Sequence, residues 1–129
     1  SWAIGVVSSQ EIDHHGIAIA NALAMQRAVA NLDLQPHYIL SDQASGLKFQ
    51  IPFKTIPKAD SVVMSVAAAS ILAKVARDTL MLRYAAEYPA YGFDQHKGYG
   101  TALHLRKIEE HGPCPIHRMS FKPLKPTLI

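Results

Sequence analysis

Two acidic residues stand where metal-assisted hydrolysis could use them. Asp42 follows a short apolar run and opens a loop of small polar residues, which is where acidic side chains meet ligands at the carboxyl edge of an α/β sheet. Asp78 follows a long apolar run and lies four residues after Lys74. Two carboxylates that approach each other repel unless a divalent cation lies between them, and Mg²⁺ and Mn²⁺ prefer such oxygen ligands. The pair therefore indicates a candidate cation site, provided that the fold brings the two side chains together.

Each of these acids also has a structural interpretation. Asp42 could close an Asx-turn, because short acidic side chains accept hydrogen bonds from nearby backbone amides. Asp78 could form a surface ion pair with Lys74 at i,i+4 spacing. A two-metal site for phosphodiester cleavage normally needs three or four carboxylates. The other acids of the first half fit helix caps and helix starts better: Glu11, Asp13 and Asp60.

A glycine-hinged loop over residues 96–101 is the second candidate. Its sequence, His-Lys-Gly-Tyr-Gly-Thr, joins a lysine and a histidine to two glycines, an aromatic ring and the start of a predicted helix. Such a loop suits contacts with phosphate and sugar. The alternative is a flexible turn in which Tyr99 is simply buried.

Other catalytic chemistries find little support. The histidines lack the spacing of a zinc site and have no cysteine partners, so we interpret most of them as surface or capping residues: His14, His15, His104, His111 and His117. Cys114 lies between two prolines without a base at a defined spacing, and neither a nucleophile elbow nor a P-loop occurs in the sequence. Acyl transfer and nucleotide hydrolysis are therefore unsupported.

Composition predicts one folded domain over residues 1–129, because 49% of the residues are hydrophobic and 18% are charged. The uncharged stretch over residues 61–73 is shorter than the roughly 18 residues that cross a bilayer, so we expect a soluble protein without a membrane partner. The single cysteine favours the cytoplasm, and the net charge of +3 tolerates a polyanionic partner. The start at Ser1, without signal-peptide features, is expected to be a cut.

Three short strands are expected to position these residues. Residues 2–7 are bulky and β-branched, residues 37–40 form a second apolar run with Asp42 beyond its carboxyl end, and residues 53–56 form a third. Three strands make a thin sheet, since sheets commonly hold about 4 to 6 strands. An extended tail is expected over residues 113–129, after a Pro-Cys-Pro sequence.

Helices are expected between and after these strands. A capping box at Ser8 begins the first helix, which Gly16 interrupts. Residues 61–84 predict the strongest helix, whose first half is almost wholly small or apolar and should be buried on most sides. Thr101 caps a last helix over residues 102–111. The element order predicts a mixed α/β fold in which helices cover the sheet.

Several of these segments together resemble ribonuclease HII, the type 2 ribonuclease H family that cuts RNA in RNA/DNA hybrids. The most specific are the run over residues 65–78, which ends in Arg77-Asp78, and the His-Lys-Gly-Tyr-Gly-Thr loop over residues 96–101. Shorter matching segments bring the resemblance to nearly the whole chain: residues 11–13, 24–29, 88–93 and 115–121.

The resemblance implies a ribonuclease H-like mixed sheet flanked by helices, and an incomplete one. In the family, four acids hold two Mg²⁺ or Mn²⁺ ions, and Asp42 and Asp78 match the third and fourth of them. The first two belong to an amino-terminal Asp-Glu-x-Gly-Arg-Gly motif, which does not occur in these 129 residues. The first two strands of the family's sheet are then missing as well. We expect the exposed edges to pair between copies, by strand exchange or self-association, or the first strand to repack.

The implied activity is endonucleolytic hydrolysis of RNA in RNA/DNA hybrids, including cleavage 5′ of single ribonucleotides in duplex DNA, by two-metal catalysis. Asp42 and Asp78 would be the catalytic metal ligands. Tyr99 matches the family tyrosine that stacks on the sugar and senses its 2′-hydroxyl, and Lys97 would contact phosphate. With two of the four acids, we expect these residues to be inactive alone and to cleave once the missing segment is supplied.

Two other classes of function stay open at this point. A non-catalytic relic could serve as a nucleic-acid-binding or assembly module, and it would bind hybrids in a salt-dependent manner without cleaving them. A metal-free structural domain would be favoured if Asp42 and Asp78 lie too far apart to share an ion.

Overall fold

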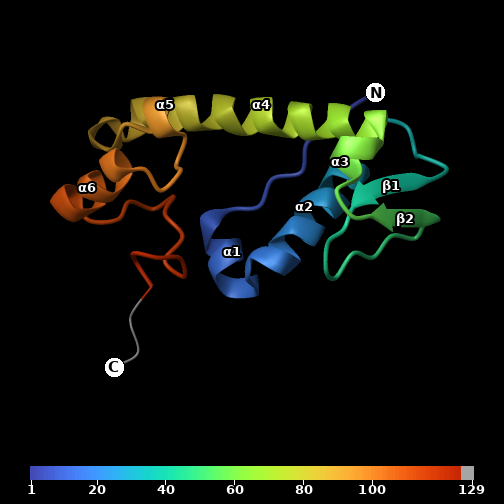
Figure 1. Ribbon diagram of the computed structural model, residues 1–129, viewed down its shortest axis with the longest axis horizontal. Coiled ribbons are helices and arrows are strands. Elements are labelled where there is room, and N and C mark those ends of the chain that lie inside the picture. Colours follow the sequence, from blue (N-terminus) through green and yellow to red (C-terminus); the bar gives the residue numbers. More distant parts are fainter. Residues whose placement is uncertain (126–129) are drawn as a thin grey trace. The chain divides into compact units, whose positions relative to one another are not determined.

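A computed structural model describes residues 1–125 of the chain. It contains two compact units, a first unit over Ser1–Ala73 and a second unit that begins at Lys74. Helices and a small parallel sheet make a mixed α/β structure, as predicted (Figure 1). The boundary between the units lies within the longest helix, α4 (Met64–Glu87), so this helix supplies residues to both. That residues 1–129 form one domain stays a prediction.

The first unit begins with two helices, α1 (Ser9–His15) and α2 (Ile17–Ala30). The predicted capping box is present: the Ser8 hydroxyl accepts a hydrogen bond from the Glu11 amide at 3.2 Å, and the Ser8 amide donates to the Glu11 carboxylate at 2.9 Å. Gly16 separates the helices with φ at +78°, a left-handed value that favours glycine. The predicted interruption at this residue is confirmed.

The prediction of a strand at residues 2–7 is wrong. This segment has no regular structure and lies against α2, whose side chains bind its carbonyl oxygens. Arg27 donates to Val6 at 2.6 Å and Asn31 donates to Ile4 at 3.0 Å. Arg27 also pairs with Glu11 at 2.5 Å, which lowers the pKa of that carboxyl to about 2. Neither strand of the described residues pairs with this segment, and side chains of α2 bind its carbonyl oxygens instead.

We expect Gly5→Ala to destabilise the first unit. A Cβ at this position would overlap the carbonyl oxygen of Ala24 and lie 2.6 Å from the amide nitrogen of Ala28, and these backbone atoms belong to a helix that cannot yield locally. Such overpacking costs roughly 1–3 kcal/mol, so the urea midpoint followed by circular dichroism should fall. Gly100→Ala is the control, because its Cβ would meet nothing within 4 Å. Equal losses in the two variants would contradict this packing.

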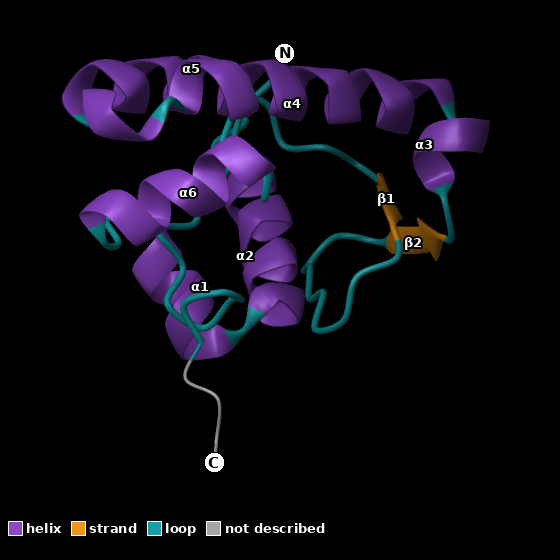
Figure 2. Ribbon diagram, turned by 60° about the vertical axis from the view of Figure 1, so that its left-hand side comes forward, coloured by secondary structure: helices purple, strands orange, loops and turns teal. Residues whose placement is uncertain are grey.

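A two-stranded parallel sheet completes the first unit (Figure 2). Strand β1 (Ile39–Asp42) pairs with β2 (Phe53–Ile56), with Asp42 opposite Ile56 at the carboxyl end. The predicted strand at residues 53–56 is confirmed. The strand predicted at residues 37–40 is shifted by two residues, so Asp42 is its last residue rather than part of the following loop. Two strands, rather than the expected three, occur among the described residues, so the sheet is incomplete.

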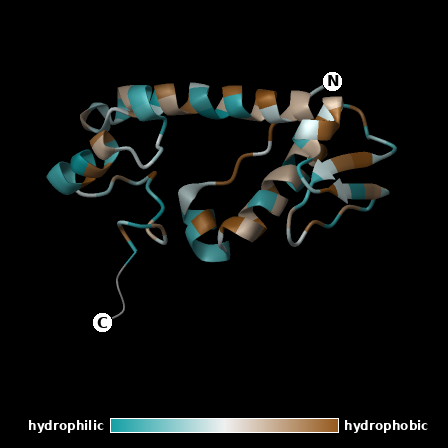
Figure 3. Cartoon of the chain, in the orientation of Figure 1, coloured by the Kyte–Doolittle hydropathy of each residue, from teal (hydrophilic) through white to brown (hydrophobic). Residues whose placement is uncertain are grey.

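The helix predicted over residues 61–84 is two helices, α3 (Ala59–Val62) and α4, because Val63 adopts an extended backbone between them. The expected burial of α4 is wrong: none of its residues, all of which the structure describes, is buried. Ile71 is 64% exposed and Val75 58% exposed, and apolar residues recur along the helix (Figure 3). Apolar composition predicts burial only where another surface is available, and the two described strands supply too little of it.

Up to residue 125, the second unit contains the C-terminal part of α4 and three shorter helices, η1 (Pro89–Tyr91), α5 (Phe93–His96) and α6 (Ala102–His111). The bounds predicted for α6 are confirmed, and the Thr101 hydroxyl caps it by accepting from the His104 amide at 3.3 Å. A small core fixes the unit, with further apolar side chains of α4 packed against it; its buried members are Tyr91, Phe93 and Cys114.

The sequence predicts an extended tail over residues 113–129, after α6. Its described part instead contains turns, closed by main-chain hydrogen bonds such as the one from the His117 amide to the Cys114 carbonyl at 2.9 Å. Residues 126–129 lie outside the described residues. Across the part of the chain that the structure describes, no helix combines the length and the apolar character that membrane crossing requires.

Candidate functional site

Asp78 lies on the part of α4 that belongs to the second unit, among three cationic side chains. One carboxylate oxygen, Oδ2, accepts from the Lys74 ammonium at 2.6 Å. The other, Oδ1, lies 3.8 Å from the Arg77 guanidinium, beyond hydrogen-bond distance. Oδ1 is buried and has no hydrogen-bond partner among the described residues. The structural interpretation of Asp78 as an ion-pair partner of Lys74 is therefore correct, but it accounts for only one of the two oxygens.

Electrostatics keep Asp78 ionised. The hydrogen bond from Lys74 is the main cause that lowers the pKa of Asp78, and the charges of Lys74, Arg77 and Lys97 lower it further against the opposing effect of desolvation. The same hydrogen bond raises the pKa of the Lys74 ammonium. Asp78 is thus a permanently charged acceptor at neutral pH, as a ligand for a hard cation must be.

The loop over residues 97–101 lies against the same stretch of α4. Lys97 and Gly98 both have left-handed backbones, with φ of 49° and 78°, and a Cβ on Gly98 would lie 3.2 Å from the Met81 Cε atom. This close approach brings Tyr99 beside Arg77, whose guanidinium lies 4.8 Å from the centre of the ring. Tyr99 is 55% exposed, so the alternative in which it is simply a buried turn residue is wrong.

One surface of the second unit therefore joins three of the predicted site residues: Asp78, Lys97 and Tyr99. The Lys97 ammonium donates to the Asp94 carbonyl, and because an ammonium has three donors it keeps capacity for a further acceptor. Cations next to an exposed aromatic ring are typical of surfaces that contact phosphate and stack on sugars or bases. We refer to this set, Lys74, Arg77, Asp78, Lys97 and Tyr99, as the Tyr99 surface.

Asp42, the fourth predicted site residue, belongs to the first unit. It is half-buried at the end of β1, and its Oδ1 atom accepts from the amide of Gln43 at 2.7 Å. This contact is to the next residue rather than to the amide two residues on that defines an Asx-turn. The neighbouring Ser41 hydroxyl is buried without a hydrogen-bond partner among the described residues. Since Asp42 and Asp78 lie in different units, a cation shared between them stays a prediction.

The donor atoms of the described residues fit part of a metal site. Among residues 1–125, no group of three or more histidine, cysteine, aspartate or glutamate side chains could hold a metal ion. The unpartnered Oδ1 of Asp78 is a suitable oxygen ligand, and Mg²⁺ and Mn²⁺ bind through one or two protein carboxylates together with water and substrate phosphate. The described residues therefore offer single ligands for a hard cation rather than a finished site.

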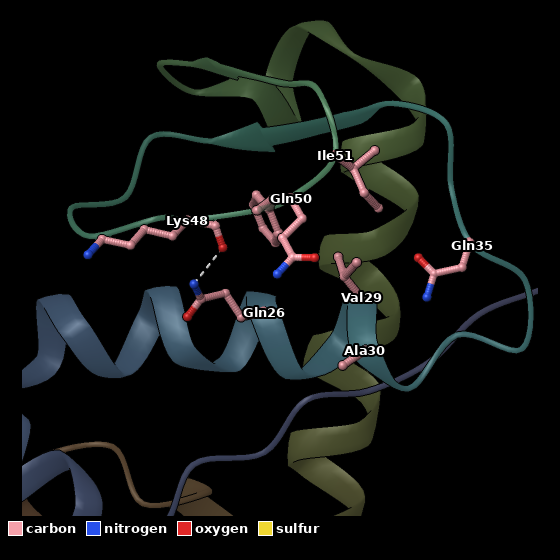
Figure 4. A pocket seen from close by; sticks show the side chains of 8 residues that line it. Gln26, Val29, Ala30, Gln35, Lys48, Gln50 and Ile51 are labelled. Carbon is pink, nitrogen blue, oxygen red and sulfur yellow. Dashed lines mark hydrogen bonds between the residues drawn. The ribbon is translucent and has the colours of Figure 1, made fainter.

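An open pocket of about 280 Å³ lies on the first unit (Figure 4). Within it, the Gln26 amide donates to the Lys48 carbonyl oxygen at 2.6 Å. Amides, apolar side chains and one lysine make up its lining: Gln26, Val29, Ala30, Gln35, Lys48, Phe49, Gln50 and Ile51. This set contains no acid, so the pocket does not carry the candidate metal chemistry.

The sequence interpretation missed a cluster of histidines in the second unit. His104, expected to be a surface or capping residue, is buried with 6% exposure, and His96 is buried to the same degree. The spacing held a weak signal, because His104 and Ile108 are one turn apart and both form the buried face of α6.

Comparisons with known proteins agree with one another. The ribonuclease HII family matches residues 3–124. Ribonuclease HII of Bordetella avium is 52% identical over 125 residues, covering 97% of this chain and 62% of that protein. Ribonuclease HII of Chlorobaculum parvum is 52% identical over 126 residues, covering 95% of this chain and 60% of that protein.

A solved structure with a similar fold points to the same family. The crystal structure of ribonuclease H2 from Pyrococcus horikoshii is similar with a TM-score of 0.71 and 27% identity, covering 92% of this chain and 64% of that one. The present chain spans about three fifths of the length of the curated relatives described above.

Proposed function

The chain belongs to the ribonuclease HII family, and from this premise we propose that it forms part of an endonuclease that hydrolyses RNA in RNA/DNA hybrids. Its substrates include duplex DNA that contains a single ribonucleotide, cut on the 5′ side of that nucleotide. The observation that carries the proposal is the Tyr99 surface, where an exposed ring, three cations and an ionised carboxylate lie together. The fold agrees, since this mixed α/β structure is similar to that of ribonuclease H2.

The residues of the Tyr99 surface contact different parts of the substrate. Tyr99 stacks on the ribose and senses the 2′-hydroxyl, the group that distinguishes RNA from DNA. Lys97 contacts a phosphate next to that sugar, and Arg77 holds the ring of Tyr99 through its guanidinium. The binding energy from phosphate contacts depends on salt, whereas the contact with the sugar gives the preference for a ribonucleotide.

Asp78 and Asp42 are the proposed metal ligands, with Mg²⁺ or Mn²⁺ as the cofactor. When bound, a pair of such ions activates the attacking water and stabilises the leaving oxygen. The described residues supply two of the four acids that this chemistry uses in the family. We therefore propose that these 129 residues do not cleave alone and that the further acids come from a segment carrying the Asp-Glu-x-Gly-Arg-Gly motif.

Complementation tests this proposal. We expect the chain, mixed with a family segment that carries the Asp-Glu-x-Gly-Arg-Gly motif and with Mn²⁺, to cut a labelled duplex 5′ of its single ribonucleotide. Neither component alone should cut, and an all-DNA duplex of the same sequence should stay intact. Fluorescence anisotropy of the labelled segment shows independently whether it binds. Binding of the segment without any cleavage would refute the assignment of Asp42 and Asp78.

A non-catalytic nucleic-acid-binding or assembly module is the second candidate. It is favoured by the pairing of Asp78 with Lys74 and by the lack of a three-ligand cluster among the described residues. Salt-dependent binding of hybrids that persists without cleavage in the complemented mixture would support it.

Two further expectations stay proposals. The two-stranded sheet leaves an edge of each strand unpaired among the described residues, and we propose that copies associate through these edges. The free thiol of Cys114 agrees with the cytoplasmic location that we propose.

A further inference from the structure

Three histidines of the second unit form a connected cluster that the proposed function does not use. His96 and His104 stack with ring centres 4.2 Å apart and planes at 15°. His104 Nε2 lies 3.1 Å from His117 Nε2. The ring of Phe93 makes edge-type contacts with His96 and His104, so the cluster lies against the small core of this unit.

The backbone partners determine which nitrogen of each ring carries hydrogen. His104 Nδ1 lies 3.0 Å from the carbonyl oxygen of Tyr99, and a carbonyl can only accept, so Nδ1 must donate. A neutral imidazole carries one N–H, and therefore His104 Nε2 is an acceptor. His117 Nε2 must then donate to it.

The contacts of His117 with Cys114 agree with this direction of the hydrogen bonds. If His117 Nε2 carries the hydrogen, His117 Nδ1 must accept, and the Cys114 amide donates to it at 2.9 Å. The Cys114 thiol lies 3.1 Å from the same nitrogen. The reverse direction would place an N–H on His117 Nδ1 against the Cys114 N–H, and two lone pairs between His104 and the Tyr99 carbonyl. The Cys114 carbonyl oxygen lies 3.3 Å from His117 Nδ1 and would need a hydrogen on that nitrogen. We assign the hydrogen to Nε2 because the contact from the Cys114 amide is shorter, at 2.9 Å, and requires Nδ1 to accept.

His96 holds the other side of the same loop. Its Nε2 atom donates to the Tyr91 carbonyl at 2.8 Å, and its Nδ1 atom accepts from the Gly98 amide at 3.1 Å. The loop is thus fixed at two successive residues, at the amide of Gly98 by His96 and at the carbonyl of Tyr99 by His104. The Tyr99 ring itself stays exposed.

We propose that His117 and His104 form a relay of hydrogen bonds between neutral imidazoles that positions the Tyr99 backbone, and that protonation of His104 breaks the hydrogen bond between the two rings. His104 and His117 are positioning residues, because they act on substrate only through Tyr99. The relay stands on the contacts above, whereas its consequence for ribose recognition rests on the proposed function of Tyr99.

Protonation opposes the relay at each ring. A cationic His104 would carry a hydrogen on Nε2 that faces the His117 N–H, and a cationic His117 would carry one on Nδ1 that faces the Cys114 N–H. The ionisable groups that act on His104 are His96 and His117, and those that face His117 are His96, His104 and the Cys114 thiol, with the Tyr91 phenol ring 5.2 Å from His117.

Burial supports the neutral state. Desolvation is the main cause that lowers the pKa of both His104 and His117 from the usual 6.5, and the hydrogen bond to the Tyr99 carbonyl only partly offsets it for His104. A histidine with a lowered pKa in the folded state adds stability that is complete above its unfolded pKa and lost as pH falls below it. The relay should therefore be intact at pH 7.5, and it weakens only as pH falls through the lowered pKa values of the folded state.

Nitrogen-15 NMR of the imidazoles in this chain tests the relay without nucleic acid. At pH 7.5 we expect His104 as the Nδ1–H tautomer and His117 and His96 as Nε2–H tautomers, each with one dominant form. The exposed histidines of α1, His14 and His15, supply reference signals from the same sample. A dominant Nε2–H tautomer for His104, or averaged shifts like those of the reference signals, would overturn the relay.

Binding measurements test its consequence for Tyr99. The readout is the ratio of dissociation constants of this chain for an all-DNA duplex and for one with a single ribonucleotide, measured without divalent metal. We expect His104→Leu to lower this preference about 3- to 10-fold, as loss of a hydrogen bond does. His104→Asn, whose amide places a donor where Nδ1 was, should keep the preference within about 2-fold. His111→Leu, on the exposed side of α6, is the control.

The dependence on pH separates positioning from simple folding. A protonated His104 keeps its Nδ1 hydrogen on the Tyr99 carbonyl and loses only the hydrogen bond from His117, so between pH 7.5 and 5.5 the preference of the unaltered chain should fall by less than the loss in His104→Leu, and that of His104→Asn should not change through this group. If His104→Leu fails to fold, His117→Leu, which removes the donor to His104 Nε2, is measured in its place and should lower the preference, whereas His117→Gln, which keeps a donor near the Nε2 position, should retain it. An unchanged preference in a folded His104→Leu with the predicted tautomers in the parent would overturn the positioning role alone. A Tyr99→Ala variant with full preference would instead refute the proposed function of Tyr99.

Discussion

Asp78→Asn lowers the cleavage rate of the complemented mixture by about 1,000-fold, the largest effect that we expect from a single substitution. A metal-bound carboxylate contributes several kcal/mol to the stabilisation of the transition state, and each 1.36 kcal/mol corresponds to about tenfold in rate. The amide keeps the size of the side chain but carries no charge, so it holds a hard cation poorly. Single-turnover cleavage of the ribonucleotide-containing duplex with Mn²⁺ measures the effect.

Loss of folding does not account for this expected result. The ion pair between Asp78 and Lys74 is exposed on the lysine side and joins residues four apart on one helix, and such pairs contribute little to stability. The thermal midpoint of Asp78→Asn should therefore stay close to that of the parent chain. Glu109→Gln, which removes the same charge from an exposed position on α6, is the matched control. A rate for Asp78→Asn within tenfold of that control would remove Asp78 from the metal site.

Local chemistry explains which elements the sequence predicted well. The capping box at Ser8, the interruption at Gly16 and the cap at Thr101 each depend on residues within four positions of one another, and all three occur as predicted. The bounds of α6 follow from Thr101 at one end and Gly112 at the other. Signals of this kind need no information about the rest of the fold.

Two predictions that depended on segments distant in the sequence were wrong. Residues 2–7 have the composition of a strand, but a strand exists only where another one pairs with it, and here α2 side chains bind the backbone instead. The apolar first half of α4 predicted burial, but burial requires a covering surface, and Ile71 remains largely exposed. Both errors concern what lies opposite a segment, which local composition does not specify.

The candidate site follows the same division. Asp78, Lys97 and Tyr99 were singled out by residue type and by family resemblance, and the structure brings the loop against α4 through the left-handed Lys97 and Gly98. The histidine relay was missed because His96, His104 and His117 come from three separate segments. Their roles arise from backbone carbonyls and amides that the folded chain places beside them. The spacing of the histidines in the sequence does not predict these contacts.

Tyr99→Ala should weaken binding of the ribonucleotide-containing duplex by about 1 to 3 kcal/mol, the usual loss when an aromatic ring that stacks on a nucleotide is removed. This corresponds to about 5- to 150-fold in the dissociation constant. Tyr99→Phe keeps the ring and should retain most of the affinity, because stacking depends on the π-face rather than the hydroxyl. Fluorescence anisotropy of labelled duplexes at fixed salt measures each variant.

Tyr38→Ala is the control for this prediction, because Tyr38 is 55% exposed, the same fraction as Tyr99, but lies in the first unit. It should leave binding unchanged. The decisive comparison is between substrates: Tyr99→Ala should lose more affinity for the ribonucleotide-containing duplex than for all-DNA, because phosphate contacts are common to both and the sugar contact is not. Equal losses on the two duplexes would mean that Tyr99 only adds contact area, and the reading of the 2′-hydroxyl would then have to come from other residues.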